Sequence, residues 1–438
     1  MPILTEQQAK MMIEKVLSFS KADETSVTMN GGRTGNIRYA RNTVSTSGEK
    51  DNLSMSVTCS FGKRSGTAST NELDDESIMR AVALAQETAR LAPENPEYMP
   101  VLGPQQYAPS KTYNESTAKL SAAARADIAL ASISSCKQRN AVAAGYLEDN
   151  ATFVAIGNNK GLFGYNRDTL VDFTVTARTA DDKGSGFAWN TFNDVAQFSS
   201  KKATAIAIEK AIASANPIEM PPGKYTAILE PAAMSELLSS FVNALDARSA
   251  EEGRSFFSKK GGGTKLGEQL FSDKLSIYSD PSHPQLPGSP FAGDGRPMEK
   301  VVWIEKGVLK NFYYSRYWAD KKGTTALPAN PSVIIEDGDQ TIEQMIRNTE
   351  KGILITHMFY VRALDPQNIV STGLTRDGLF YIENGAIKNA IKNFRWNESP
   401  VNIFRNLEAV GKAVRTGNSM IPALKTRDFN FASLSDAV

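Results

Sequence analysis

Side chains able to bind or react are densest between positions 360 and 397. Arg362 and Asp365 end one run of strand-forming residues, and Arg376 and Asp377 lie within the next. Arginine and aspartate near strand ends form bidentate pairs that hold loops, and the same groups bind a carboxylate or a peptide backbone. Holding loops is the commoner use, and peptide binding is the functional alternative. The residues to which we assign a peptide-binding role are Arg362, Asp365, Arg376, Asp377, Glu383 and Asn384.

Signals of a metal-dependent or nucleophilic active site are weak. The chain has two histidines, His283 and His357, so a Ser-His-Asp or Cys-His site would have to use one of them. It contains neither a GxSxG turn nor an HExxH or HExxxH pair. His283 lies with Asp280 and Asp294 in one polar loop, where a divalent cation could bind. Because aspartates in loops rich in proline and glycine commonly cap turns, no metal site is predicted there.

The composition excludes several classes of protein. The chain has 438 residues, of which 41% are hydrophobic, enough for a large core in two or three domains. It has 49 basic and 48 acidic residues, so direct nucleic-acid binding is not expected. No apolar run approaches the ~20 residues of a membrane span, and the first residues do not resemble a secretory signal. We therefore expect a cytoplasmic protein with no membrane segment, whose two cysteines, Cys59 and Cys136, are buried free thiols.

The first half of the chain divides into two segments, 1–105 and 115–218, joined by a proline-rich linker. Each segment has helices around alternating, half-buried strand patterns, which indicates α+β structure with antiparallel sheets. In the first segment a capping box at Thr5 begins a helix, and a second helix spans about 75–91. The expected strands are 25–29, 36–41, 53–61, 65–69, 141–148, 151–158 and 170–178, and the expected later helices are 116–137 and 199–215.

The third segment, 224–438, is predicted to be mostly antiparallel β, as a curved or barrel-like sheet. A strand at 225–229 precedes a helix at about 232–246, whose apolar residues recur at the helical period. Hairpin patterns follow at 301–309 and 379–387, the second with an Asn384-Gly385 pair suited to a type I′ turn. Aromatic residues at 312–318 would suit either an exposed interface or core packing. The overall fold class is therefore α+β.

Several short sequences together resemble the TldD/PmbA family, which is also named for modulation of DNA gyrase. The resemblance covers nearly the whole chain and is specific in combination rather than in any one piece. The sequences that carry it are 41–42, 61–71, 265–268, 295–297, 360–362, 372–378, 382–385 and 393–395.

The resemblance implies a cytoplasmic peptidase system in which two related subunits pair and degrade unfolded peptides. Its TldD type carries HExxxH on the helix that opens the last segment, together with a distant cysteine ligand, and its PmbA type lacks that site. This chain has Ser239, Ser240 and Ala244 at the His, Glu and His positions, and no cysteine in 418–425. Alanine cannot bind a metal and serine hydroxyls are poor zinc ligands. The resemblance thus implies a PmbA-type subunit without a catalytic metal or other cofactor, with zinc only in a TldD-type partner.

Other functions stay open at this point. The chain could form a homodimer or a heterodimer with a TldD-type subunit, and peptides are its expected substrates. It could instead be a metal-free homodimeric peptide-binding or regulatory protein of the gyrase-modulator type. A third alternative is a hydrolase that uses His283 with the nearby aspartates, or Arg376 with Asp377. Whether this chain is itself an enzyme is not decided by its sequence.

Overall fold

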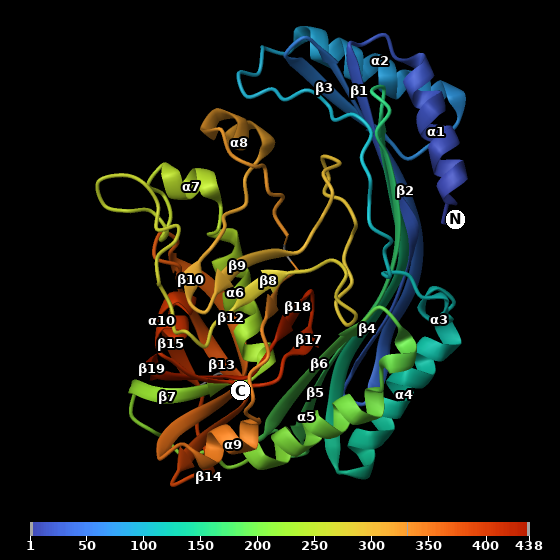
Figure 1. Ribbon diagram of the computed structural model, residues 1–438. Coiled ribbons are helices and arrows are strands. Elements are labelled where there is room, and N and C mark those ends of the chain that lie inside the picture. Colours follow the sequence, from blue (N-terminus) through green and yellow to red (C-terminus); the bar gives the residue numbers. More distant parts are fainter. Residues whose placement is uncertain (1–2, 331, 436–438) are drawn as a thin grey trace.

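The computed structural model describes residues 3–330 and 332–435. A long curved sheet with helices on its outer face forms one side of the molecule, and a β-rich C-terminal body lies inside the curve (Figure 1). The fold is therefore α+β with antiparallel sheets, as the sequence predicts. In the described ranges, none of the helices is long and apolar enough to cross a membrane.

The curved sheet is continuous across the two N-terminal segments, each of which contributes three strands. All its neighbouring pairs are antiparallel, in the order β3-β2-β1-β4-β5-β6. The predicted division of 24–40 and of 141–158 into two strands each is wrong, because each range forms one continuous strand. Gly31 and Gly32 do not end β1, because residues on both sides of them keep paired with β2 and β4. The strands are β1 (Glu24–Ala40), β2 (Thr43–Phe61), β3 (Arg64–Thr70), β4 (Ala141–Asn158), β5 (Phe163–Thr179) and β6 (Ser185–Phe192).

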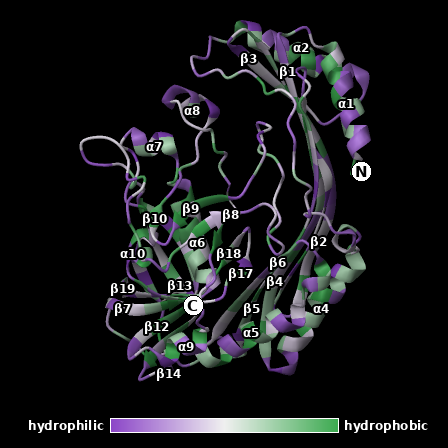
Figure 2. Cartoon of the chain, viewed as in Figure 1, coloured by the Kyte–Doolittle hydropathy of each residue, from purple (hydrophilic) through white to green (hydrophobic). Residues whose placement is uncertain are grey.

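Two pairs of helices cover the outer face of this sheet (Figure 1). One core lies between the strands and the first pair, and a second core between the strands and the other pair. Figure 2 shows these helices in mixed purple and green, as expected where one side packs on a sheet and the other meets water. The predicted capping box of Thr5 with Gln8 is confirmed. The first pair is α1 (Glu6–Phe19) and α2 (Asp75–Leu91); the second is α4 (Ala122–Gln138) and α5 (Ser200–Ser214), with the short α3 (Glu115–Ala118) and η1 (Val195–Gln197) beside it.

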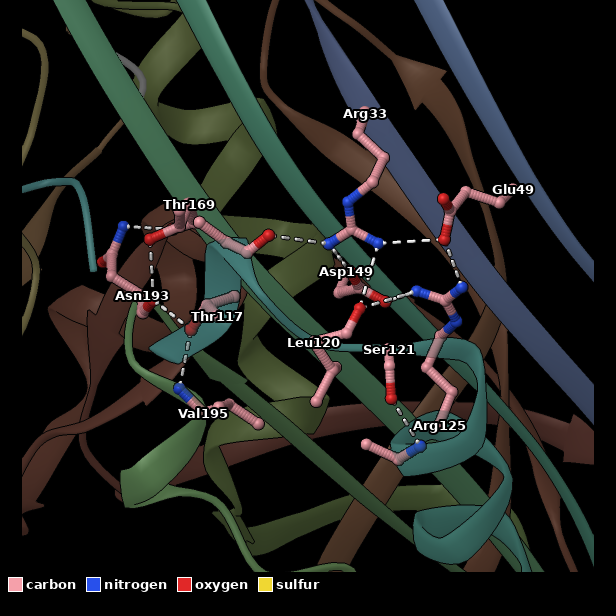
Figure 3. Close-up of polar contacts among 12 residues, drawn as sticks. Arg33, Glu49, Thr117, Leu120, Ser121, Arg125, Asp149, Thr169, Asn193 and Val195 are labelled. Atoms are coloured by element: carbon pink, nitrogen blue, oxygen red, sulfur yellow. Dashed lines mark hydrogen bonds and ion pairs between the residues drawn. The ribbon is translucent and has the colours of Figure 1, made fainter. Parts of the chain in front are cut away.

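An ionic cluster of two arginines and two carboxylates lies between the two cores, on the helix-covered face of the sheet (Figure 3). The buried Arg125 of α4 donates to Asp149 of β4 at 2.9 Å and to Glu49 of β2 at 2.5 Å. Arg33 of β1 donates to the same two carboxylates, at 2.6 and 3.1 Å. Gly35 leaves the space that the guanidinium needs, since a Cβ there would lie 2.1 Å from Nη1 of Arg125. The cluster thus fastens the start of α4 to three adjacent strands.

The C-terminal body contains a closed barrel, which confirms the predicted barrel-like sheet. Five strands pair in the order β12-β7-β19-β15-β13, and β13 pairs back with β12. Only β7 and β12 are parallel within that ring. Its strands are β7 (Gly223–Leu229), β12 (Lys351–Asp365), β13 (Val370–Glu383), β15 (Phe394–Glu398) and β19 (Leu424–Leu434), with β14 (Ala386–Ala390) and β16 (Leu407–Val410) attached.

A second sheet packs beside the barrel in the order β10-β9-β8-β11-β18-β17. Both predicted hairpins, at 301–309 and 379–387, are present. Phe312 and Trp318 are 1% and 5% exposed within the main core, so core packing explains these two residues. Tyr313, Tyr314 and Tyr317 are only partly buried against that core, and an interface role for them stays a prediction. The remaining elements are α6 (Pro231–Asn243), α7 (Ala247–Glu251), β8 (Ile277–Ser279), β9 (Val301–Glu305), β10 (Val308–Leu309), α8 (Arg316–Lys322), β11 (Ile334–Ile335), α9 (Ile342–Arg347), α10 (Pro400–Arg405), β17 (Val414–Thr416) and β18 (Ser419–Ile421).

Candidate functional site

Two adjoining cavities lie where the curved sheet meets the C-terminal body. The first has a volume of about 290 Å³ and is formed by α6, the β17–β18 hairpin and Trp189 of β6. The second, of about 450 Å³, lies between β6, the start of α6 and β17. Trp189 and Thr416 line both cavities, so the two are neighbours in one cleft. We call them the first and second cavity below.

The sequence of α6 explains which of its side chains reach the first cavity. Pro231 occupies the first turn, where a missing N–H costs no helical hydrogen bond. Met234, Leu237, Leu238 and Phe241 recur at the helical period and are buried. The polar residues between them therefore face away from the core. Those that line the first cavity are Ser235, Glu236, Ser239 and Asn243.

The tip of the β17–β18 hairpin packs on Trp189. Gly417 adopts a φ of 58°, and a Cβ there would lie 3.0 Å from the indole ring. The indole Nε1 donates to Asp172 of β5 at 2.7 Å, which fixes the ring between the two cavities. Asn418 and Ser419 follow at the hairpin tip and line the first cavity.

The residues that the resemblance places at the family's metal positions do not fit a zinc ion. Of the three positions, Ser239 lines the first cavity, whereas Ser240 and Ala244 are not among its lining residues. None of the three side chains is an imidazole, thiolate or carboxylate. No group of three or more histidine, cysteine, aspartate or glutamate residues that could hold a metal occurs within residues 3–330 and 332–435. No chemical step through a metal is therefore derived for this chain.

Charged residues surround the second cavity. Lys210 of α5 pairs with Glu230, the residue before α6. Arg415 of β17 lines the cavity and donates to Asn193 and to the Gln285 carbonyl oxygen, the latter at 3.2 Å. Burial raises the pKa of Asp168, on β5, to about 7, although the charge of Arg415 opposes the rise. No local pattern predicts this group of residues, because its members are dispersed between positions 168 and 415 and share no motif.

The loop considered for metal binding uses its polar residues locally. Asp280 accepts from the backbone N–H of Ser282 at 2.8 Å, and Nδ1 of His283 accepts from that of Gln285 at 3.3 Å. Asp294 pairs with Arg296 at 2.8 Å. These contacts are those of turn-capping residues.

The residues assigned to peptide binding lie along one long hairpin and its continuation, and none of them lines either cavity. Asp365 closes the turn after β12 by accepting from Gln367, Asn368 and the Asn368 side chain. Arg362 and Arg376 lie over the rings of Tyr360 and Phe359. Glu383 and Asn384 lie at the opposite end of β13, where Asn384 and Gly385 have φ of 50° and 77°, as a type I′ turn requires. Peptide binding by this set stays a prediction.

Asp377 belongs instead to a contact between the sheet and the barrel. Its carboxylate binds Nδ1 of His357 at 2.9 Å and accepts from the hydroxyl of Ser185, at the start of β6. The His357 ring stacks on Phe187 of β6, with centroids 4.0 Å apart. Serine and histidine therefore share one carboxylate, which is not the arrangement of a nucleophile hydrogen-bonded to its base. This geometry gives no support to a hydrolase based on Arg376 and Asp377.

We expect Asp377→Asn to weaken the fold by about 1.5–3 kcal/mol near neutral pH, the range for hydrogen bonds to a charged group. Burial raises the pKa of Asp377, but His357, Ser185 and Arg376 together hold it below the ordinary value. Stabilisation by a carboxyl group with a lowered pKa is present above its unfolded pKa and is lost as the pH falls through the folded value. The difference in melting temperature between wild type and variant should thus shrink as the pH falls below about pH 4.

Asparagine tolerates the left-handed conformation of this position, whose φ is 58°, so backbone strain does not confuse the comparison. Asp273→Asn, at an exposed aspartate, is the control for loss of a carboxylate elsewhere. A difference between wild type and Asp377→Asn that did not change with pH would contradict the assignment.

Three comparisons with known proteins bear on identity. Models of the PmbA/TldA metallopeptidase match the chain as domain 1 at residues 26–89, as the central domain at 108–215 and as the C-terminal domain at 222–433. Metalloprotease PmbA of Escherichia coli O157:H7 is 22% identical over 96% of this chain and 97% of its own. An uncharacterized protein of Methanocaldococcus jannaschii is 34% identical, but the match spans only 24% of either chain.

Solved structures share the fold. TldE from Thermococcus kodakarensis superposes with a TM-score of 0.86 at 20% identity, over 97% of this chain and 99% of that one. A Thermotoga maritima protein described as a candidate modulator of a DNA gyrase gives 0.86 at 18% identity, over 97% and 100% of the two chains. The three domain models together cover most of the sequence, and they follow one another as domain 1, central domain and C-terminal domain. The chain belongs to the PmbA/TldD family.

Proposed function

We propose that this chain is the PmbA-like, metal-free subunit of a cytoplasmic TldD/PmbA-type peptidase system acting on unfolded peptides. It supplies part of a peptide-binding surface, and a TldD-type partner carries the zinc and the hydrolytic chemistry. The observation that carries this proposal is the first cavity. This cavity is lined by Ser239, one of the positions where the resemblance places a metal ligand, while Ser239, Ser240 and Ala244 provide none of the expected ligands.

The cleft supports a role in holding extended peptide. Within the described ranges, β6 pairs only with β5 and β17 only with β18, so each is the edge strand of its sheet, and both line the second cavity. Side chains already bond to part of the β6 edge, since Ser214 bonds to the Ser185 backbone and Lys210 donates to the Phe187 carbonyl oxygen. An extended peptide adds to such an edge through main-chain hydrogen bonds, which do not depend on its sequence. Phe187, Trp189 and Phe192 offer apolar contact along the same strand.

Metal content is the first test of the proposal. The protein should be purified without a metal-affinity tag and its zinc measured by elemental mass spectrometry. We expect well under about one tenth of an equivalent per chain, because the site has no good zinc ligand. About one zinc per chain would contradict the proposed loss of the metal.

Subunit pairing is the second test. We expect the chain, mixed with a purified TldD-type protein, to elute as a heterodimer and to increase hydrolysis of an unfolded peptide. A stable homodimer that ignores the TldD-type chain but still binds peptide would favour the alternative, a metal-free peptide-binding or regulatory protein. Peptide hydrolysis by the chain alone, lost in His283→Ala, would favour a site outside the family's.

A further inference from the structure

We propose that the first cavity binds a primary ammonium group of a peptide, at its N-terminus or on a lysine side chain. This inference rests on the proposed peptide function and adds to it the charge of the group recognised. It starts from the mismatch between the retained cavity and the missing metal ligands.

The charge of the cavity selects a cation. Glu236 is the only acidic residue among those that line it, and no lysine, arginine or histidine lines it. Throughout residues 3–330 and 332–435, the Glu236 carboxylate has no hydrogen bond or ion pair. An exposed carboxylate with no cation beside it in a concave site attracts a positively charged ligand.

The neutral groups around Glu236 suit an ammonium group. Ser239 and Asn243 on α6, with Asn418 and Ser419 on the hairpin, line the same cavity, and their side chains make no hydrogen bond within the part of the chain that is described. An ammonium group has three N–H donors and no acceptor, so it needs several oxygen atoms around it. One carboxylate with amide and hydroxyl oxygens supplies them, and the charge-assisted bond to Glu236 is the strongest of the set.

The rest of the wall suits the carbon chain of such a ligand. Trp189 is the side chain whose ring attracts cations best. Leu238, Val242, Val333 and Ile421 give the cavity an apolar side against which methylene groups can pack. A volume of about 290 Å³ is near the lower limit for ligand sites, which fits one residue rather than a long segment. The rest of the peptide would continue past Trp189 into the second cavity.

A divalent metal fits the same cavity less well. Calcium and magnesium take six or more oxygen ligands, usually including more than one carboxylate, and zinc prefers histidine and cysteine. The cavity offers one carboxylate and neither of those side chains.

The test compares peptides that differ in one charge, by isothermal titration calorimetry. Penta-alanine amide is used with a free or an acetylated N-terminus, and N-acetyl-Ala-Ala-Lys-Ala-Ala amide with a free or an acetylated lysine. We expect at least one free form to bind about tenfold tighter than its acetylated form, as a charge-assisted bond implies. Which pair shows the preference distinguishes the N-terminus from the lysine side chain.

Glu236→Gln should reduce that preference to less than about twofold, because the amide keeps the shape and removes the charge. Glu209→Gln, at an exposed glutamate of α5 that lines neither cavity, is the matched control and should keep it. Equal binding of free and acetylated peptides by wild type, or an unchanged preference in Glu236→Gln, would overturn the inference while leaving peptide binding intact.

Butylammonium, with butanol as its neutral counterpart, separates this inference from the proposed function. Both are followed by saturation-transfer NMR. If no peptide binds but butylammonium binds and Glu236→Gln abolishes its signal, the peptide function fails and the ammonium site stands. If butylammonium gives no more signal than butanol, or if an equal concentration of magnesium displaces it, the inference is wrong.

Discussion

Replacing Asp149 with alanine is expected to destabilise the protein by about 3–5 kcal/mol, the range for removing one partner of a buried ion pair. Asp149 and Arg125 are both 0% exposed, and Asp149 accepts from Arg125 and Arg33. Without that carboxylate, Arg125 keeps only the half-exposed Glu49 as its anionic partner. A buried guanidinium without enough negative charge beside it lowers the stability of the fold, because burial has removed its hydration and nothing replaces it.

Urea unfolding followed by circular dichroism measures this loss. Glu94→Ala is the matched control, since Glu94 forms a solvent-exposed pair with Arg64 at 3.8 Å and should cost less than about 1 kcal/mol. Gly35→Ala tests the same cluster without removing a charge, because the added methyl group would displace the Arg125 guanidinium. If Asp149→Ala lowered the free energy of unfolding no more than Glu94→Ala does, the ionic cluster would not stabilise the fold as its geometry indicates.

Local signals in the sequence placed many elements correctly. The helix at 75–91 has the predicted bounds because Asp74 caps its start and Pro93 lies just beyond its end. The Asn384-Gly385 turn was predictable because few residue pairs adopt positive φ at two successive positions. Both signals act over a few residues, so a single chain reveals them.

Some elements that depend on distant contacts were not predicted. Strand β6 was not predicted, although Phe187 and Trp189 alternate with smaller residues. Its Gly186 is needed because α5 passes so close that a Cβ there would lie 2.1 Å from the Ala207 carbonyl oxygen. The need for glycine at this position arises only when the helix packs on the strand, so the residues near Gly186 in the sequence do not indicate it.

The candidate site was predicted only in part for the same reason. The resemblance to the family led to Ser239, which does line the first cavity. Glu236 was overlooked, since an isolated glutamate on a helix usually faces water. Trp189 and Gly417 meet across more than two hundred positions, so their contact, which divides the cleft, follows from the packing of the sheet on the C-terminal body.

Replacing Asp168 with asparagine is expected to make the protein more stable than wild type at alkaline pH. Burial raises the pKa of Asp168 from 3.8 to about 7, with the charge of Arg415 opposing. A carboxyl group whose pKa is higher in the folded than in the unfolded state costs stability as the pH rises from the unfolded to the folded value. Three pKa units correspond to about 4 kcal/mol, which we reduce to about 2–4 kcal/mol for partial exposure to water.

The measurement is the unfolding free energy of both proteins between about pH 4 and pH 8. The advantage of Asp168→Asn should be smallest near pH 4, where the folded carboxyl group is protonated and the unfolded one is only partly ionised, and should grow steadily up to about pH 8. Asp181→Asn is the control, because that exposed carboxyl group has a lowered pKa from hydrogen bonds of Thr179 and the Lys183 backbone N–H and should give no such alkaline gain. A difference between Asp168→Asn and wild type that fell as the pH rose would contradict the expectation. It would mean that the charge of Asp168 is needed to hold Arg415 in the wall of the second cavity, and that the attraction between the two charges outweighs the cost of burying the carboxylate.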